Sequence, residues 1–374
     1  MKKLLSVLLV LVGVVSLMRT PAAAETVSTS AHAYVLYCVN NGEFLLSENA
    51  DEHLAMASTT KIMTALLTLE AAGEDNRVIT FSEDMIAEGS SMYLELGERL
   101  TLYDLAVGML MQSGNDAANA AAVALSGTVE KFAEKMNARA QKIGMKDTGF
   151  VTPSGLDAEG HYSSAHDMAL LMDAAMRNED FAAITGRTEM TVSFVEPSDK
   201  VVLCPNHNKL LTLYDGCIGG KTGYTDSAGR CLVTCAERDG LRLIAVTLDD
   251  GDDWDDHMAL YDYGFSHYRA YSPDPVTVQA DVVGGTADSV ALHTAQPDSI
   301  VLPRDEEAAV QTQVYVPAFL YAPVRTGDEV GRVRILHGDK TVAEIPLYAD
   351  RDVSYDNRPR GFIEYIKDLL NWHS

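Results

Sequence analysis

Apolar residues recur at two different spacings near the start of the chain. Hydrophobic residues dominate positions 33–39 and return at 43–46, and the Asn-Asn-Gly sequence at 40–42 between them is a tight-turn signal. This pattern predicts a β-hairpin. From residue 62 to 69 the apolar positions instead repeat every three to four residues, and Gly73 is a natural helix end. The chain therefore predicts a hairpin that is followed by a buried helix.

The same two spacings alternate through the middle of the chain. Thr101 and Asp104 resemble a capping box at the start of a helix, and Asp239-Gly240 is a hairpin turn between two apolar runs. The predicted helices span residues 101–111, 116–125, 128–143, 164–176 and 253–268. The predicted strands span residues 77–81, 191–195, 200–203, 231–236 and 242–248. Helices and antiparallel strands are therefore expected in one domain.

The pattern changes after the Ser-Pro-Asp-Pro sequence at 272–275, which predicts a domain boundary. Beyond it only short strands separated by turns are expected, and they predict a small all-β sandwich. These strands span residues 276–282, 299–302, 310–316, 333–336 and 341–347. In the last stretch, 361–372, apolar and polar residues occupy opposite faces of a helix that ends in Trp372. Contact with a membrane surface and packing against the all-β domain both stay open for this helix.

The first 24 residues have the pattern of a cleaved signal peptide. Lys2 and Lys3 precede an apolar run over residues 4–18, and small residues at 22–24 suit a signal peptidase. An uncleaved anchor is the alternative, although the run is short for a membrane span. Cleavage after Ala24 predicts an exported protein.

Length, charge and cysteine content narrow the function. A chain of 374 residues with 47% hydrophobic residues predicts two domains with real cores. The formal charge is −25, and it falls to −28 once the signal peptide leaves with three basic residues and no acidic one. Such an acidic protein is repelled by nucleic acid, so no nucleic-acid partner is expected. Five cysteines without clustered histidines predict buried apolar residues rather than a zinc site.

Three short motifs carry candidate chemistry. Ser58 and Lys61 are one helical turn apart, so the lysine amine can take the proton of the serine hydroxyl if it is desolvated. A plain helix N-cap at Ser58 is the alternative. The Ser-Gly-Asn sequence at 113–115 separates two apolar helices. It is either a simple turn or a turn whose side chains are held rigidly for binding or catalysis. Lys221 lies among glycines on or next to an edge strand, where a surface loop is the alternative.

Together, the three motifs resemble the signature of the penicillin-binding proteins and class A β-lactamases. Over residues 31–268 the sequence resembles the low-molecular-mass penicillin-binding proteins, which are serine-type D-alanyl-D-alanine carboxypeptidases. The matching segments include residues 56–64, 153–156, 208–211 and 221–225. The resemblance implies a catalytic domain at 25–271 with an antiparallel sheet flanked by helices, an all-β domain at 276–350 and an amphipathic helix at 358–374.

The resemblance also implies a role for each motif residue. Ser58 attacks the penultimate D-alanine carbonyl of a peptidoglycan stem peptide, Lys61 is its base, and Ser113 relays the proton to the leaving amine. The other implied binding residues are Asn115 for the substrate amide, Lys221 and Thr222 for the terminal carboxylate, and Gly223 and Tyr224 beside them. The backbone N–H groups of Ser58 and Tyr224 would bind the oxyanion. β-Lactam antibiotics would bind at the same site, and neither a metal ion nor an organic cofactor is implied.

Other functions share the acyl-serine step. A class A β-lactamase would carry Ser-Asp-Asn as its middle motif and a Glu-x-x-x-Asn sequence, whereas Glu159 here is followed by Gly-His-Tyr-Ser. An endopeptidase that cuts crosslinks stays open, although such enzymes commonly lack the all-β domain. A penicillin-binding sensor or an inactive wall-binding scaffold is the alternative from another class. The intact Ser58, Lys61 and Lys221 favour an active enzyme.

Overall fold

A five-stranded antiparallel sheet organises the first module of the chain. The computed structural model describes residues 27–295, 299–304 and 309–357. The strand order is β2-β1-β9-β8-β7, so β1 next to β9 joins the two ends of this module. The strands are β1 (Ala33–Cys38), β2 (Glu43–Glu48), β7 (Cys217–Thr225), β8 (Gly229–Arg238) and β9 (Leu241–Leu248). One edge of the sheet is β7, as predicted for the strand with Lys221.

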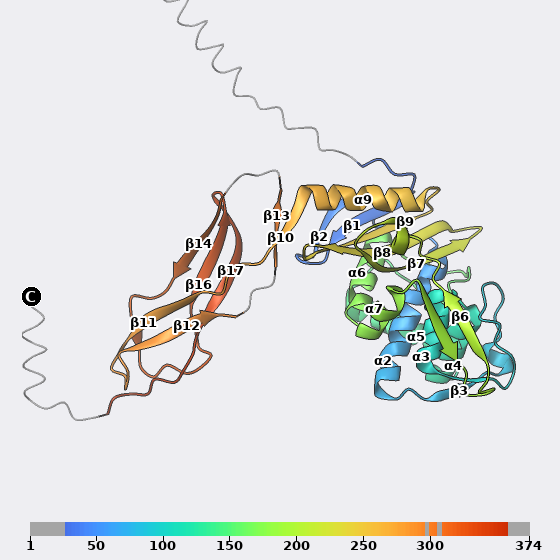
Figure 1. Ribbon diagram of the computed structural model, residues 1–374, viewed down its shortest axis with the longest axis horizontal. Coiled ribbons are helices and arrows are strands. Elements are labelled where there is room, and N and C mark those ends of the chain that lie inside the picture. Colours follow the sequence, from blue (N-terminus) through green and yellow to red (C-terminus); the bar gives the residue numbers. More distant parts are fainter. Residues whose placement is uncertain (1–26, 296–298, 305–308, 358–374) are drawn as a thin grey trace, which may run out of the picture.

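Helices cover both faces of this sheet (Figure 1). On one face α9 (Asp253–His267) packs Leu260, Tyr261 and Phe265 against the sheet, and on the other face lies the larger helical layer. That layer contains α2 (Lys61–Glu74), α3 (Leu102–Met111), α4 (Asn115–Ser126), α5 (Val129–Ile143), α6 (Ala165–Met176) and α7 (Glu179–Thr185). Strand β1 is buried along its whole length because its alternate side chains enter the cores on both faces.

Local sequence signals explain where these helices begin and end. The Thr101 side chain accepts from the Asp104 N–H, and Asp104 bonds back to the Thr101 N–H, so the predicted capping box is confirmed. Gly127 and Gly144 end α4 and α5 with positive φ angles of 82° and 97°. The alanine-rich α4 buries most of its first two turns, which allows close packing against its neighbours.

Smaller elements extend from this module. Two antiparallel pairs are β3 (Val78–Thr80) with β4 (Arg99–Thr101), and β5 (Glu189–Ser193) with β6 (Val201–Pro205). Short helical turns occur at η1 (Ala57–Thr60), η2 (Glu83–Met85) and α8 (Leu210–Leu213). The helices α7 and α8 have no counterpart in the prediction, because each is short and shows little apolar periodicity.

The second module is all β, so the predicted fold class is confirmed (Figure 1). Its six-stranded sheet has the order β14-β16-β17-β12-β11-β15 around a separate core. The strands are β11 (Thr277–Val283), β12 (Ser289–Thr294), β14 (Val310–Tyr315), β15 (Leu320–Tyr321), β16 (Glu329–His337) and β17 (Lys340–Ala349). Val353 packs into this core, so the packed module continues past residue 350.

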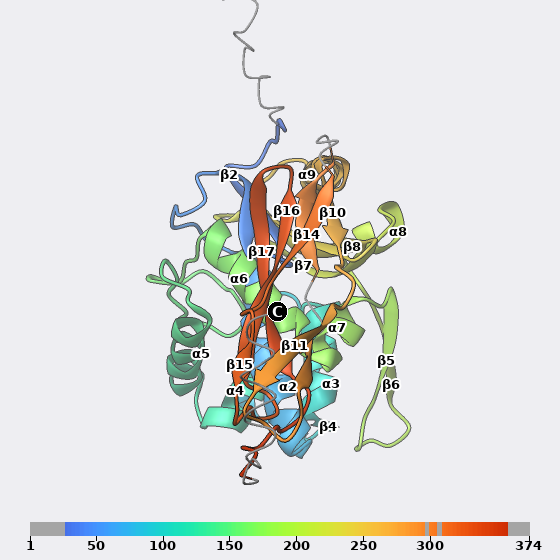
Figure 2. The same ribbon diagram turned by 90° about the vertical axis from the view of Figure 1, so that its left-hand side faces the viewer.

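One predicted strand pairs outside this six-stranded sheet. Strand β13 (Ile300–Pro303) pairs with β10 (Tyr268–Tyr271), the strand that directly follows α9. The two strands lie between the two modules (Figure 1), and Figure 2 views the molecule with the all-β module in front of the helical one. An additional hydrogen bond joins Asn40 Nδ2 of the first hairpin to Ser299 Oγ at 2.7 Å.

Within the described ranges, the structure contains no helix with the length and apolar character that a membrane crossing requires. The predicted signal peptide and the predicted amphipathic helix lie outside the described residues.

Candidate active site

Ser58 and Lys61 lie where a 3₁₀ turn continues into a buried helix. Ser58 is on η1 and Lys61 is the first residue of α2, so one helical turn brings their side chains together. Lys61 Nζ is 2.8 Å from Ser58 Oγ, and it donates a second hydrogen bond of 2.6 Å to the backbone oxygen of Ser154. The Lys61 side chain has no exposed surface. The N-cap alternative fails, because the cap position of η1 is Met56 and the cap of α2 is Thr60.

Burial gives Lys61 the character of a base. Removal from water disfavours its ammonium form, and the nearby Lys221 lowers the pKa further by like-charge repulsion. Asp116 acts in the opposite direction, but the net result is a Lys61 pKa well below the ordinary value of 10.5. An amine with such a pKa is available to accept the proton of Ser58.

The Ser-Gly-Asn turn connects α3 to α4 and faces the same site. Ser113 Oγ accepts a hydrogen bond of 3.0 Å from Lys221 Nζ. Asn115 is the first residue of α4, and its Nδ2 donates to the backbone oxygen of Glu88 at 2.6 Å. The other amide atom, Oδ1, is buried and has no hydrogen-bond partner among the described residues. Asn115 Oδ1 can therefore accept a hydrogen bond from a bound ligand.

Strand β7 brings Lys221 to this turn. Lys221 is only 2% exposed, and its Nζ also donates to the backbone oxygen of Thr222 at 2.8 Å. Burial lowers its pKa to about 7. A Cβ atom at Gly223 would lie 3.0 Å from the backbone nitrogens of both Ser58 and Thr59, so the strand touches η1 closely. The backbone of β7 therefore forms one wall beside the serine.

The three motifs line one cleft of about 510 Å³. From the predicted set, Ser58, Ser113, Thr222, Gly223 and Tyr224 form part of its wall. Lys61 and Lys221 are hydrogen-bonded to Ser58 and Ser113 of this wall, and the Asn115 N–H donates at 2.7 Å to the backbone oxygen of Ser90, which also lines the cleft. The structure thus brings together all eight residues that the sequence predicted.

Five further residues of this cleft were missed by the sequence prediction: Ser90, His207, Arg230, Asp253 and Trp254. Arg230 is on β8 directly opposite Tyr224, and its guanidinium forms an ion pair with Asp253 at the start of α9. The Arg230 side chain is still 42% exposed. The only sequence signal for Arg230 was its distance from the Lys-Thr-Gly motif. In a tight hairpin, a residue a few positions after the motif lies opposite the motif's strand.

Backbone strain coincides with both serines. Ala57, directly before Ser58, has a φ of 47°, and Ser113 itself has a φ of 59°. These values lie in the left-handed region, which costs non-glycine residues about 1 kcal/mol or more and is concentrated at functional sites. Packing must therefore hold both serines in place.

None of the described residues form a group of three or more His, Cys, Asp or Glu side chains that could hold a metal ion. The cleft instead presents the hydroxyls of Ser58 and Ser113, each hydrogen-bonded to a buried lysine amine, and the guanidinium of Arg230. This set can attack a carbonyl, move a proton and bind a carboxylate.

Known proteins match both modules. Residues 19–252 match the family model "D-alanyl-D-alanine carboxypeptidase", and residues 265–355 match "Penicillin-binding protein 5, C-terminal domain". The D-alanyl-D-alanine carboxypeptidase DacF of Bacillus subtilis is 33% identical over 99% of this chain and 98% of its own length. DacC of Escherichia coli is 33% identical over 93% of this chain and 90% of its own length.

A solved structure agrees with these matches. Penicillin-binding protein 5 from Haemophilus influenzae superposes with a TM-score of 0.73 at 29% identity, and the alignment covers 90% of this chain and 99% of that one. The resemblance inferred from the three motifs is thereby confirmed by the sequence and structure of whole chains. The chain belongs to the D-alanyl-D-alanine carboxypeptidase family of serine peptidases.

Proposed function

We propose that the protein removes the terminal D-alanine from peptidoglycan stem pentapeptides through an acyl-enzyme on Ser58. One observation supports this most strongly: a buried lysine with a lowered pKa lies 2.8 Å from Ser58 Oγ at the wall of the cleft. A serine hydroxyl alone is a weak nucleophile, and an adjacent neutral amine is what activates it. The family of the chain supports the same reaction.

The acylation step uses the side chains of the three motifs and two backbone N–H groups. Lys61 takes the proton of Ser58 as the hydroxyl oxygen attacks the carbonyl of the penultimate D-alanine. The backbone N–H groups of Ser58 and Tyr224 stabilise the oxyanion. Ser113 gives its proton to the leaving amine and takes the proton that Lys61 received from Ser58, and Asn115 Oδ1 accepts from a substrate N–H group. Terminal D-alanine then leaves, and water hydrolyses the acyl-enzyme.

The substrate carboxylate requires a cation, and two are near. Lys221 has a pKa of about 7 and already donates to Ser113 and Thr222, so its charge is incomplete at neutral pH. Arg230 carries a guanidinium group that lines the cleft, and Asp253 fixes it by an ion pair while 42% of the Arg230 side chain stays exposed. We therefore assign the terminal carboxylate to Lys221 and Thr222, with Arg230 as a second anchor. A preference for free C-termini over crosslinks follows from this assignment.

Four placements complete the proposal. Residues 1–24 are a cleaved signal peptide, and residues 25–271 form the catalytic domain. Residues 276–350 belong to the all-β domain, and residues 358–374 are the amphipathic segment, for which contact with a membrane surface and packing against that domain are the two alternatives. The enzyme then works outside the cytoplasm in cell-wall biogenesis. β-Lactams acylate Ser58 in place of the stem peptide.

The test is direct. Residues 25–374 should be labelled covalently by a fluorescent penicillin at Ser58 and should release D-alanine from a pentapeptide, whereas the Ser58→Ala variant should do neither. Labelling that survives Ser58→Ala would refute the assignment of the nucleophile. Labelling without D-alanine release would favour the sensor or scaffold, and rapid penicillin turnover would favour a β-lactamase.

A further inference from the structure

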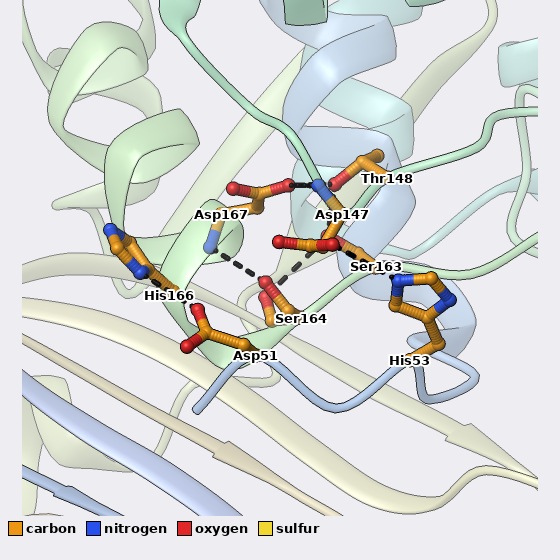
Figure 3. A network of polar contacts seen from close by, with 8 residues as sticks. All are labelled: Asp51, His53, Asp147, Thr148, Ser163, Ser164, His166 and Asp167. Atoms are coloured by element: carbon orange, nitrogen blue, oxygen red, sulfur yellow. Dashed lines mark hydrogen bonds and ion pairs between the residues drawn. The ribbon is translucent and has the colours of Figure 1, made fainter. Parts of the chain in front are cut away.

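A closed loop over residues 149–162 covers the buried lysine. Its two ends are paired by hydrogen bonds from Gly149 N to Tyr162 O at 2.9 Å and from Tyr162 N to Gly149 O at 3.0 Å. The polar network in Figure 3 fixes the paired ends of the loop to α6, because Asp167 Oδ2 accepts from both Asp147 N and Thr148 Oγ1 at 2.7 Å. The ends of the loop are therefore held independently of its tip.

The tip of the loop rests on the start of the nucleophile helix. The backbone oxygen of Ser154 accepts from Lys61 Nζ, and the backbone oxygen of Pro153 accepts from Thr64 Oγ1 at 2.6 Å. Gly155 has a φ of +88° and packs so closely on Ala57 that a Cβ atom would overlap the Ala57 carbonyl. The environment of Lys61 is therefore set by where this loop lies.

His161 connects the loop to the helix from inside. Its Nδ1 accepts from the backbone N–H groups of Val151 and Thr152 at 3.0 and 3.3 Å, so the ring proton must be on Nε2. That N–H group can then donate to Thr60 Oγ1, which is 2.9 Å away. The His161 residue is 7% exposed. One neutral imidazole thus joins the loop backbone to η1, two residues after Ser58.

We propose that His161 is a positioning residue for the reaction, which locks residues 151–156 onto the helix so that the Ser154 carbonyl orients and shields the Lys61 amine. This inference rests on the proposed function, in which Lys61 is the base. A neutral amine has two N–H bonds and one lone pair. When one N–H bond is held by Ser154, the lone pair can face the Ser58 hydroxyl. After the Ser58 proton has moved to Lys61 Nζ, the ammonium keeps its hydrogen bond to the same carbonyl.

The charges around both groups support a neutral imidazole and a sensitive amine. Burial lowers the pKa of His161 to about 4 against the opposite effect of Asp157, so the ring is uncharged at neutral pH. A proton on His161 Nδ1 would face the N–H groups of Val151 and Thr152 and would break both of their hydrogen bonds to the ring. The Lys61 amine faces Lys221 from β7 and Asp116 from α4, and burial is the largest influence on its pKa. Water that enters through a loosened loop would therefore raise the Lys61 pKa.

Two substitutions at His161 separate positioning from mere packing. His161→Gln can accept from the Val151 N–H and donate to Thr60, whereas His161→Phe fills similar space without either bond. The measurement is the second-order rate of acylation by a fluorescent penicillin across pH, with the melting temperature recorded for each variant. The expected result for His161→Phe is an acid limb about one pH unit higher and a rate about tenfold lower below it, because a one-unit rise in pKa leaves tenfold less neutral amine. His161→Gln should keep the wild-type limb.

Each outcome decides the inference. If His161→Phe melts earlier but is acylated with the wild-type rate and pH profile, the residue is only structural and the inference is wrong. If His161→Phe does not fold, Thr60→Val decides, since it removes only the acceptor of the imidazole N–H and should shift the limb in the same direction. If the wild-type protein is not labelled at Ser58 at all, the proposed function itself has failed.

Discussion

The contact between Gly155 and Ala57 provides a quantitative test of how the site is held together. The ideal Cβ of an alanine at 155 would lie 1.9 Å from the Ala57 oxygen, 2.5 Å from the Ala57 carbonyl carbon and 2.9 Å from Thr60 Oγ1. Real Cβ atoms essentially never come within 3.0 Å of such atoms. Gly155→Ala must therefore push the loop and η1 apart by about 1 Å or more. A shift of η1 would displace Ser58, and a shift of the loop would displace the Ser154 carbonyl that holds Lys61.

Two costs add in this variant. The left-handed φ of +88° costs an alanine about 1–2 kcal/mol in the folded state. The displacement acts on catalysis, since a misplacement of about 1 Å at a reacting group can lower the rate about 10²-fold. We expect Gly155→Ala to be acylated by penicillin about 10²-fold more slowly than the wild type. Its melting temperature should also fall by more than the φ cost alone predicts.

Gly160→Ala is a matched control in the same loop. Its φ of +82° is nearly the same, but the nearest atom to the added Cβ is Val151 Cγ2 at an ordinary 3.8 Å. This variant should lose only the φ cost of about 1–2 kcal/mol, which lowers the melting temperature by several degrees. Its acylation rate per folded molecule should stay within about threefold of the wild type. Equal acylation rates for the two variants would refute the argument that the Gly155 contact positions the site.

Three further predictions concern other parts of the protein. Arg230→Gln should lower kcat/KM about 10- to 100-fold for a peptide with a free C-terminus but little for the C-terminal amide, measured as release of D-alanine or its amide. Lys221→Met should abolish activity yet melt higher than wild type at pH 7, and this gain should shrink towards pH 10. The reason is that the buried Lys221 has a pKa of about 7 against 10.5 when unfolded, so the wild-type stability rises with pH between these values. Leu292→Ala, in the fully buried core of the all-β module, should destabilise that module by about 2–5 kcal/mol in calorimetry and leave acylation of Ser58 unchanged.

The sequence predicted the elements with strong periodicity or clear end signals. The hairpin of β1 and β2 and the helix α3 with its capping box follow from local residues, so their positions agree with the structure within a few residues. The three motifs were predictable as chemistry because each is contiguous. Their assembly into one site was not predictable, since Ser113 and Lys221 are 108 residues apart and only the folded sheet brings β7 next to η1.

The parts that escaped prediction depend on contacts between distant segments. No local pattern shows that β13 pairs with β10 instead of joining the six-stranded sheet, because pairing is decided by the register of both partners. His161 had no visible role either, since its partners are two backbone N–H groups and a threonine 101 residues earlier in the chain. Ser154 acts through a backbone oxygen, which sequence identity does not reveal.

The electrostatics of Lys61 and Lys221 link substrate binding to the protonation state of Lys61. Lys61 and Lys221 are both buried, burial lowers the pKa of each, and Lys221 lowers the pKa of Lys61 further by like-charge repulsion. A carboxylate entering beside Thr222 and Arg230 favours the ammonium form of Lys221, because an opposite charge stabilises it. The charge so stabilised on Lys221 then disfavours a proton on Lys61. In the proposed mechanism, binding of a free C-terminus would therefore make the base Lys61 more completely neutral when Ser58 must lose its proton, and a substrate without that carboxylate would lack this effect.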